Sequence, residues 1–252
     1  SVRQFNDTVR EVYAATPTDL RGRRQRERGS AGEVTMRLAV RTPFAGRALL
    51  DFLALRAVPG VEEAGPDWYA RTLDLPHGPG TVRIELRDVT DVGQTALLPA
   101  TFRLTDLRDT SAAVERVRRL LDADCDPIAV DEALGDDPLL RPLVRRRPGL
   151  RVPGHVDGPE VAVRAVLGQQ VSVAGARTIA GRLTQSHGTP LETPDGSLTH
   201  LFPSPAALAA LDAETLPMPR SRGRALVALT QALAAGDVAL DRGPDRADVR
   251  AG

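Results

Sequence analysis

The sequence contains no lysine, and all 33 of its basic residues are arginine. Within these residues, this excludes a Walker-type phosphate lysine, a Schiff-base lysine and a lysine general base. Aromatic residues make up only 3% of the chain, so any stacking pocket built from it alone would be thin. The single cysteine, Cys125, excludes an internal disulfide framework and fits a reducing compartment.

The chain also lacks a net charge, a membrane-length apolar run and the familiar catalytic signatures. Its 33 acidic residues balance the 33 basic ones, so no overall positive field indicates a nucleic-acid partner. The apolar runs are far shorter than the roughly 20 residues of a membrane span. The sequence has no nucleophile elbow, no zinc-binding H-E-x-x-H pair and no glycine-rich phosphate loop.

The residue types that commonly bind metals are scattered along the chain. The histidines show no ligand spacing with one another or with the cysteine; they are His77, His155, His187 and His200. We therefore predict no metal site and assign the histidines to surfaces or loops. Asp124 and Asp126 flank Cys125 and oppose thiolate formation, so a buried or inert cysteine is expected.

The hydropathy pattern of the first half favours an α+β layer. Strands are expected where apolar and polar residues alternate or β-prone residues gather, at 34–41, 67–75, 81–89 and 98–104. Helices are expected at residues 46–57, which Pro59-Gly60 ends, and after a capping Ser111. This order suggests an antiparallel sheet with helices on one face.

After the arginine-rich residues 145–151 the strand pattern disappears, and this half is predicted to be all-helical. Helices are expected at 160–167, at 172–186, from the Ser204-Pro205 pair, and from Ser221 to Ala235, where Gly236 ends the helix. At the other end of the chain, residues 1–21 have a helical pattern. Residues 22–32 are rich in charge and poor in apolar residues, which indicates a linker.

Two segments suggest binding chemistry. Residues 168–172 place the long amides of Gln169 and Gln170 at a joint between helices, where they can cap backbone groups or hydrogen-bond to nucleobases. Residues 218–224 place Arg220, Arg222 and Arg224 around a helix N-terminus with no acid nearby in sequence. Such a terminus favours an anion, and a phosphate is a natural candidate.

These segments carry a family resemblance. Residues 160–183 resemble the opening helices of the helix-hairpin-helix domain in AlkA-type DNA-3-methyladenine glycosylases II, and residues 147–154, 200–205 and 218–222 resemble other parts of that domain. Residues 52–58 and 69–71 resemble the N-terminal lobe of the family, a sheet-and-helix layer similar to the TATA-binding-protein fold. Residues 1–21 resemble the end of an AraC-type helix-turn-helix domain of the Ada kind, so the whole is similar to a piece of an Ada–AlkA fusion.

The resemblance implies an α+β fold in four parts. Residues 1–21 would be the end of the AraC-type domain, and residues 22–32 would be the linker. Residues 33–146 would form the N-terminal α+β domain of the AlkA type. Residues 147–252 would form the first, incomplete part of an all-α helix-hairpin-helix glycosylase domain.

The resemblance also implies an activity and a set of site residues. The family hydrolyses the N-glycosidic bond of alkylated purines in double-stranded DNA after it extrudes the nucleotide, with no cofactor. The implied protein is a monomer of the bacterial cytoplasm, associated with the nucleoid and not with a membrane. The implied base-pocket residues are Phe52 and Arg56, the position that wedges into the gap left by the flipped base is Gln170, and the other DNA-binding residues are Gln169, Ser172, Arg220 and Arg222.

Some parts of the family pattern have no counterpart in these residues. The glycine-rich hairpin and the catalytic aspartate of the family would follow residue 252, so no catalytic residue is assigned and we expect no glycosylase activity from residues 1–252 alone. Because lysine is absent, a monofunctional glycosylase is expected. Cys125 lies in the wrong domain to be the methyl-accepting cysteine of an Ada regulator.

Two other interpretations stay open on the sequence. The chain could belong to an AraC/Ada-type sequence-specific transcriptional regulator whose glycosylase-like lobe only scans DNA for damage. It could also be a two-domain helical protein without a nucleic-acid role. A glycine-rich hairpin and an aspartate beyond residue 252 would favour catalysis over a purely binding function.

Overall fold

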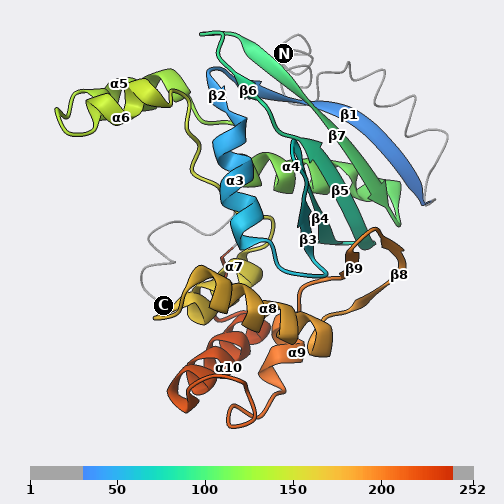
Figure 1. The fold of residues 1–252 in the computed structure, drawn as a ribbon. Helices are drawn as coiled ribbons and strands as arrows, with labels where there is room; N and C mark the ends of the chain where they lie inside the picture. The colour runs from blue at the N-terminus through green and yellow to red at the C-terminus, as the bar shows by residue number, and fades with distance from the viewer. Residues whose placement is uncertain (1–30, 241–252) are drawn as a thin grey trace. The chain divides into compact units, whose positions relative to one another are not determined.

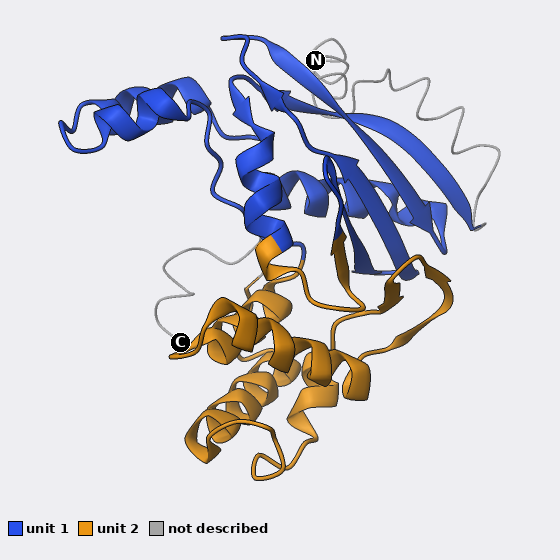
Figure 2. Ribbon diagram, viewed as in Figure 1, with its two compact units in different colours: residues 1–54, 64–156 blue, residues 55–63, 157–252 orange. Residues whose placement is uncertain are grey.

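The computed structural model describes residues 31–240, which form two compact units (Figures 1 and 2). The first unit contains the described residues up to Ala54 together with Ala64–Val156. The second contains Leu55–Glu63 together with the described residues from Asp157 onward. The predictions for residues 1–21 and for most of the linker lie outside the described residues.

The first unit is built on a five-stranded sheet with the strand order β1-β7-β5-β4-β3 (Figure 1). Its strands are β1 (Gly32–Arg41), β3 (Glu62–Ala64), β4 (Trp68–Leu75), β5 (Gly78–Glu85) and β7 (Thr95–Leu104). A two-stranded sheet joins β2 (Phe44–Ala45) to β6 (Asp88–Val89). The pairs β1–β7, β7–β5 and β5–β4 are all antiparallel, which confirms the predicted antiparallel layer.

Alternating side chains of this sheet build the core of the first unit. One row across the strands consists of Met36, Ala100, Ile84 and Tyr69, each paired in register with the next. All four are at most 7% exposed. Helices α3 (Gly46–Arg56) and α4 (Thr110–Leu120) contribute buried residues to the same core. The period-2 alternation in the sequence therefore identifies the face of the sheet that is buried.

The start of α4 differs from the prediction. Ser111 is not its cap, because a 3₁₀ turn, η1 (Leu107–Asp109), precedes the helix and Asp109 occupies the N-cap position. The buried Asp109 carboxylate makes no capping bond and instead accepts the backbone N–H of His77 at 2.9 Å. Asp106, whose carboxylate accepts the backbone N–H of Arg108, caps η1.

Two short helices, α5 (Pro127–Gly135) and α6 (Arg141–Arg146), form a hairpin in the first unit that the sequence analysis did not predict (Figure 1). Asp126 caps α5 and Pro127 opens it, so a start signal was present. The hairpin supplies almost nothing to the core: Pro127 is its one buried helical residue. Without a core-facing stripe, the apolar pattern gave no helical signal.

The second unit is mainly helical and confirms the predicted α+β fold class of the chain. It contains α7 (Gly158–Gly168), α8 (Val173–His187), α9 (Pro205–Ala209) and α10 (Arg220–Ala235). It also contains one hairpin, β8 (Pro190–Asp195) and β9 (Leu198–His200), where only helices were predicted. The Asp195-Gly196 pair at its turn, with Gly196 at φ +64°, is the sequence signal that identifies this hairpin.

The helix ends of this unit partly match the prediction. Ser204 caps α9 with its hydroxyl group, as expected, whereas Ser172, which was predicted as the first residue of a helix, is the cap of α8. Gly236 ends α10 in the left-handed conformation at φ +80°. Ser221 is not the cap of α10, because the helix already begins at Arg220 after Pro219. Proline fixes the chain direction at this start without a side-chain hydrogen bond.

Residues 55–63 contribute to the core of the helical unit although they are distant from it in sequence. Val58 and Val61 are completely buried and pack with Val163, Leu167 and other apolar side chains of the helices. Between residues 31 and 240, no helix combines the length and the apolar character that a membrane span requires.

Candidate nucleic-acid interface

The joint between α7 and α8 is a tight turn over residues 168–172. Gln169 is the C-cap of α7, where its backbone is extended, and Gln170 follows in the left-handed region at φ +56°. Both glutamines are exposed, and neither side-chain amide bonds to any part of the chain that the structure describes. The prediction that these amides lie at a bend between helices is confirmed, and the alternative that they cap backbone groups is wrong.

The conformation of Gln170 is itself unusual. The left-handed region costs a residue with a Cβ about 1–2 kcal/mol, and glycine or asparagine normally occupies it. Such outliers persist where the surrounding structure fixes them, and they concentrate at functional sites. Ser172 supplies part of this constraint, because its Oγ accepts the backbone N–H of Gly175 at 3.1 Å and fixes the start of α8.

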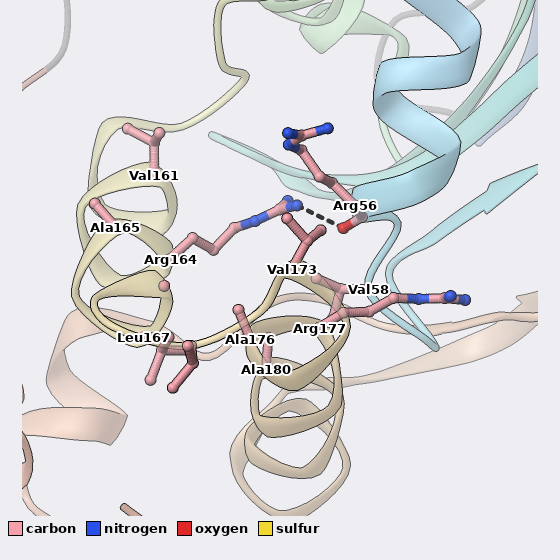
Figure 3. Close-up of a pocket in the computed structure, with 12 residues that line it drawn as sticks. Arg56, Val58, Val161, Arg164, Ala165, Leu167, Val173, Ala176, Arg177 and Ala180 are labelled. Atoms are coloured by element: carbon pink, nitrogen blue, oxygen red, sulfur yellow. Dashed lines mark hydrogen bonds between the residues drawn. The ribbon is translucent and has the colours of Figure 1, made fainter. Parts of the chain in front are cut away.

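A pocket of about 290 Å³ borders this turn and lies wholly within the second unit (Figure 3). Its walls come from the 56–58 segment, from α7 and from α8. They combine an apolar surface with three arginines; the lining residues are Arg56, Val58, Val161, Arg164, Ala165, Leu167, Gly168, Val171, Val173, Ala176, Arg177 and Ala180. Because Gly168 and Val171 belong to the turn, the turn and the pocket form one continuous surface.

Two of the three pocket arginines bind the main chain of the 56–58 segment. The Arg164 Nη2 donates to the carbonyl of Arg56 at 2.8 Å (Figure 3). The Arg177 Nε donates to the carbonyl of Ala57 at 2.5 Å. The segment is therefore attached to both helices that flank the turn. Arg56 thus lines the pocket, and its assignment to the base pocket stays a prediction.

Phe52, the second residue assigned to the base pocket, lies one helical turn before Arg56 in α3. It is 40% exposed, belongs to the first unit and is not among the residues that line the pocket. Its assignment stays a prediction.

The arginine cluster at the start of α10 is partly neutralised. Glu214 binds both Arg220, at 2.8 Å, and Arg224, at 3.1 Å. Although no acid lies nearby in sequence, the intervening loop returns Glu214 to the helix start. Arg222 forms no ion pair with any residue that the structure describes, so it is the arginine of this cluster best placed to bind a phosphate.

Other side chains considered from the sequence have structural explanations. Burial raises the pKa of the Cys125 thiol, and the charge of Asp122 adds to the effect. Asp124 and Asp126 were predicted to oppose the thiolate, but Asp124 is paired with Arg118 and Asp126 caps α5. Within residues 31–240, no three His, Cys, Asp or Glu side chains gather as metal ligands.

Comparisons with known proteins agree with this architecture. Residues 35–157 match the model of the AlkA N-terminal domain. The probable bifunctional transcriptional activator/DNA repair enzyme AlkA of Mycobacterium tuberculosis is 47% identical over 249 residues, which are 97% of this chain and 49% of that protein. The DNA-3-methyladenine glycosylase 2 of Escherichia coli is 37% identical over 199 residues, which are 77% of this chain and 65% of that protein.

A solved structure, the 3-methyladenine DNA glycosylase of Archaeoglobus fulgidus, has the same fold with a TM-score of 0.63 and 18% identity. The match covers 77% of this chain and 66% of that one. The architecture is thus that of a DNA glycosylase. Residues 35–157 match an AlkA N-terminal domain, and the chain as a whole is similar to AlkA-type glycosylases over most of its length. It spans about half the length of the mycobacterial relative that it matches.

Proposed function

We propose that this chain acts in DNA base-excision repair, as part of a glycosylase that hydrolyses the N-glycosidic bond of alkylated purines of the 3-methyladenine type. The observation that carries the proposal is the exposed left-handed turn 168–172 beside a pocket that Arg56 lines. The names of the two relatives, a DNA repair enzyme and a DNA-3-methyladenine glycosylase, support it. A transcriptional role belongs to the printed name of the mycobacterial relative, and no feature of residues 31–240 favours a purely regulatory protein.

In this proposal each segment of the interface has one task. The side chain of Gln170 enters the duplex where the nucleotide leaves the stack, and the exposed amide of Gln169 assists beside it. Extrusion of a base costs a few kcal/mol, which the wedge offsets by filling the gap. Arg222 binds a backbone phosphate, and Arg220 contributes less because Glu214 holds it. Ser172 keeps the turn in place as the cap of α8.

The chemistry of the substrate explains why little acid–base catalysis is needed. Alkylation at N3 or N7 makes the purine cationic, which weakens the glycosidic bond and improves the leaving group. An aspartate of the whole protein then stabilises the positive charge that develops on the sugar, while water completes hydrolysis. We further propose that Phe52 and Arg56 contact the extruded base, and that the protein is a cytoplasmic monomer that works on double-stranded DNA of the nucleoid.

The variant Gln170→Gly tests the role of the turn, because it separates conformational strain from DNA binding. Glycine relieves about 1–2 kcal/mol of left-handed strain and loses about 0.4–1 kcal/mol through the unfolded state. We therefore expect the free energy of unfolding to stay unchanged or to rise slightly. At the same time, the preference for a duplex with a tetrahydrofuran abasic analogue over an undamaged duplex falls about tenfold.

Fluorescence anisotropy at fixed salt measures both affinities, and urea unfolding measures the stability. Gln185→Gly, at an exposed position of α8, is the matched control for loss of a glutamine. An unchanged preference in Gln170→Gly would contradict the wedge. A wild-type chain that binds both duplexes equally would contradict the proposed function.

A further inference from the structure

Arg164, one of the arginines that line the pocket, donates hydrogen bonds to three other residues of the chain. Arg164 of α7 donates from Nη1 to the Oε2 of Glu62 and to the Oε1 of Glu160, each at 2.9 Å. Its Nη2 donates to the carbonyl oxygen of Arg56 at 2.8 Å (Figure 3). The two carboxylates are almost completely buried, with side chains 3% and 8% exposed, whereas the Arg164 side chain is 24% exposed.

The carboxylate of Glu62 extends this network into the 56–62 segment. Its Oε2 also accepts the backbone N–H of Val58 at 2.8 Å, and its own backbone N–H donates to the carbonyl of Val58 at 2.8 Å. Hydrogen bonds therefore connect Arg164 to Glu62 and to Arg56, and Glu62 to Val58. The position of the Arg56 main chain, where its side chain begins, depends on this set.

The geometry of a guanidinium suits this position. Its planar fork presents several N–H donors in fixed directions, so one side chain can bind two carboxylates and a carbonyl at once. An ammonium group would keep the charge that the buried carboxylates require, but it would lose the fixed directions. A substitution of Arg164 by lysine therefore separates the effect of the positive charge from the effect of the guanidinium geometry.

We propose that Arg164 is a positioning residue for the base pocket: it fixes the main chain of Arg56, and with it the side chain that meets an extruded base. This inference rests on the proposed function, since it assigns the purpose of the network to recognition of the lesion. Arg164 touches no base and no reacting atom. It acts through Arg56, with Glu62 and Glu160 as its anchors.

The variant Arg164→Lys tests the proposal, with Arg182→Lys at an exposed position of α8 as the matched control. The readout is the ratio of the affinities for a duplex with an N7-methylated purine, which supplies the base that Arg56 would meet, and for an undamaged duplex. We expect Arg164→Lys to lower this ratio about tenfold, as small displacements of a binding group do. The affinity for undamaged duplex and its salt dependence should change less than about twofold, because phosphate contacts do not involve Arg164.

A second variant, Glu160→Gln, keeps Arg164 and Glu62 in place and removes one charged acceptor. We expect a smaller fall of the ratio, accompanied by faster hydrogen exchange at the backbone amides of Val58 and Glu62.

The positioning role is overturned if Arg164→Lys leaves the ratio unchanged, or if it weakens binding to both duplexes equally, as a purely structural residue would. If the wild-type chain itself shows no preference for the duplex with the N7-methylated purine, the proposed function fails first, and the wild-type measurement alone identifies that outcome.

Discussion

At the scale of single residues, carboxylates decide much of the local structure. Asp106 caps the 3₁₀ turn before α4, Asp126 caps α5, and Glu62 holds the 56–62 segment. In each case a carboxylate satisfies backbone N–H groups that would otherwise lack a partner, and an arginine pairs with the same side chain. The arginines of these three pairs therefore act as structural partners of aspartate and glutamate.

The hydrogen bonds between Asp106 and Arg108 predict that part of the free energy of unfolding depends on pH in the acid range. The Arg108 guanidinium, which donates to the Asp106 carboxylate, and the Arg108 backbone N–H lower the pKa of Asp106 to about 2. Because this pKa lies below that of the unfolded chain, about 3.9, the contribution is fully present above pH 4 to 5. It is lost as the pH falls from about 4 to about 2.

Urea unfolding of wild type and Asp106→Asn across pH 7 to 2 measures this contribution. We expect the difference between their unfolding free energies to be constant above pH 5 and to shrink below pH 4. Asp91→Asn, at an exposed position between β6 and β7, is the control. The difference between its unfolding free energy and that of the wild type should not shrink below pH 4. A difference that stays constant down to pH 2 would contradict the assignment.

At the scale of elements, the segment 147–154 shows why several glycines are required. A Cβ at Gly149 would lie 2.3 Å from the carbonyl oxygen of Pro43, and Gly149 adopts φ +73°. A Cβ at Gly154 would lie 2.3 Å from the carbonyl oxygen of Arg119. Arg151 between them is buried and donates to the carbonyls of Arg41 and Pro43. By its packing this segment belongs to the first unit, although its sequence resembles the opening of the second domain.

Because the Pro43 backbone lies so close to Gly149, a methyl group added at Gly149 should lower the free energy of unfolding strongly. Gly149→Ala combines left-handed strain of about 1–2 kcal/mol with overpacking of about 1–3 kcal/mol, so the free energy of unfolding should fall by about 2–5 kcal/mol. Gly135→Ala, in α5 with no atom within 4 Å of the added Cβ, should raise it by about 0.5–1 kcal/mol. Denaturant unfolding of both variants checks the pair. Equal effects of the two substitutions would show that the approach of the Pro43 backbone imposes no constraint.

The elements that the sequence predicted are those with a strong local signal. The strands with one buried face follow from the alternation around Met36 and Leu98, and the cap at Ser204 follows from a serine and a proline before a helix. The hairpin β8–β9 and the helices α5 and α6 were missed because they contribute little to a core. The bend at Gln169 and Gln170 was predictable from a helical pattern interrupted by long amides.

The rest of the candidate site depends on contacts between distant parts of the chain, which the sequence does not indicate. No local pattern connects Arg164 with Glu62, which are 102 positions apart, or Arg177 with Ala57. Glu214 returns to the start of α10 through an irregular loop, so its pairing with Arg220 was also unexpected. The helical pattern of the sequence therefore predicted the turn at residues 168–172. The pocket beside the turn was not predictable from the sequence.

At the scale of the whole molecule, residues 31–240 contain two separate hydrophobic cores. Tyr69, Phe102 and Leu98 belong to the core around the sheet, and Leu167, Leu183 and Leu226 belong to the core of the helical unit. Cores of this kind allow two cooperative transitions instead of one. A destabilising substitution in one core should then act mainly on the unit that contains it.

Leu167→Ala and Leu98→Ala test the independence of the cores. Both leucines are at most 1% exposed, so each substitution should cost about 2–5 kcal/mol in its own unit. Native-state hydrogen exchange followed by mass spectrometry should show lost protection in α7, α8 and α10 for Leu167→Ala, and in β1, β5 and β7 for Leu98→Ala. Loss of protection throughout both units in either variant would show that they unfold as one.

Residues 55–63 belong to the second unit but precede most of the first unit in sequence, and this order has a consequence for biosynthesis. A ribosome releases this segment, with Val58 and Val61, well before α7 and α8 have been made. During that interval the two valines have none of the neighbours that later cover them, and the nascent chain must keep them from pairing elsewhere. Completion of the helical unit is therefore a later step than assembly of the sheet of the other unit, which can form as soon as β7 and α4 emerge.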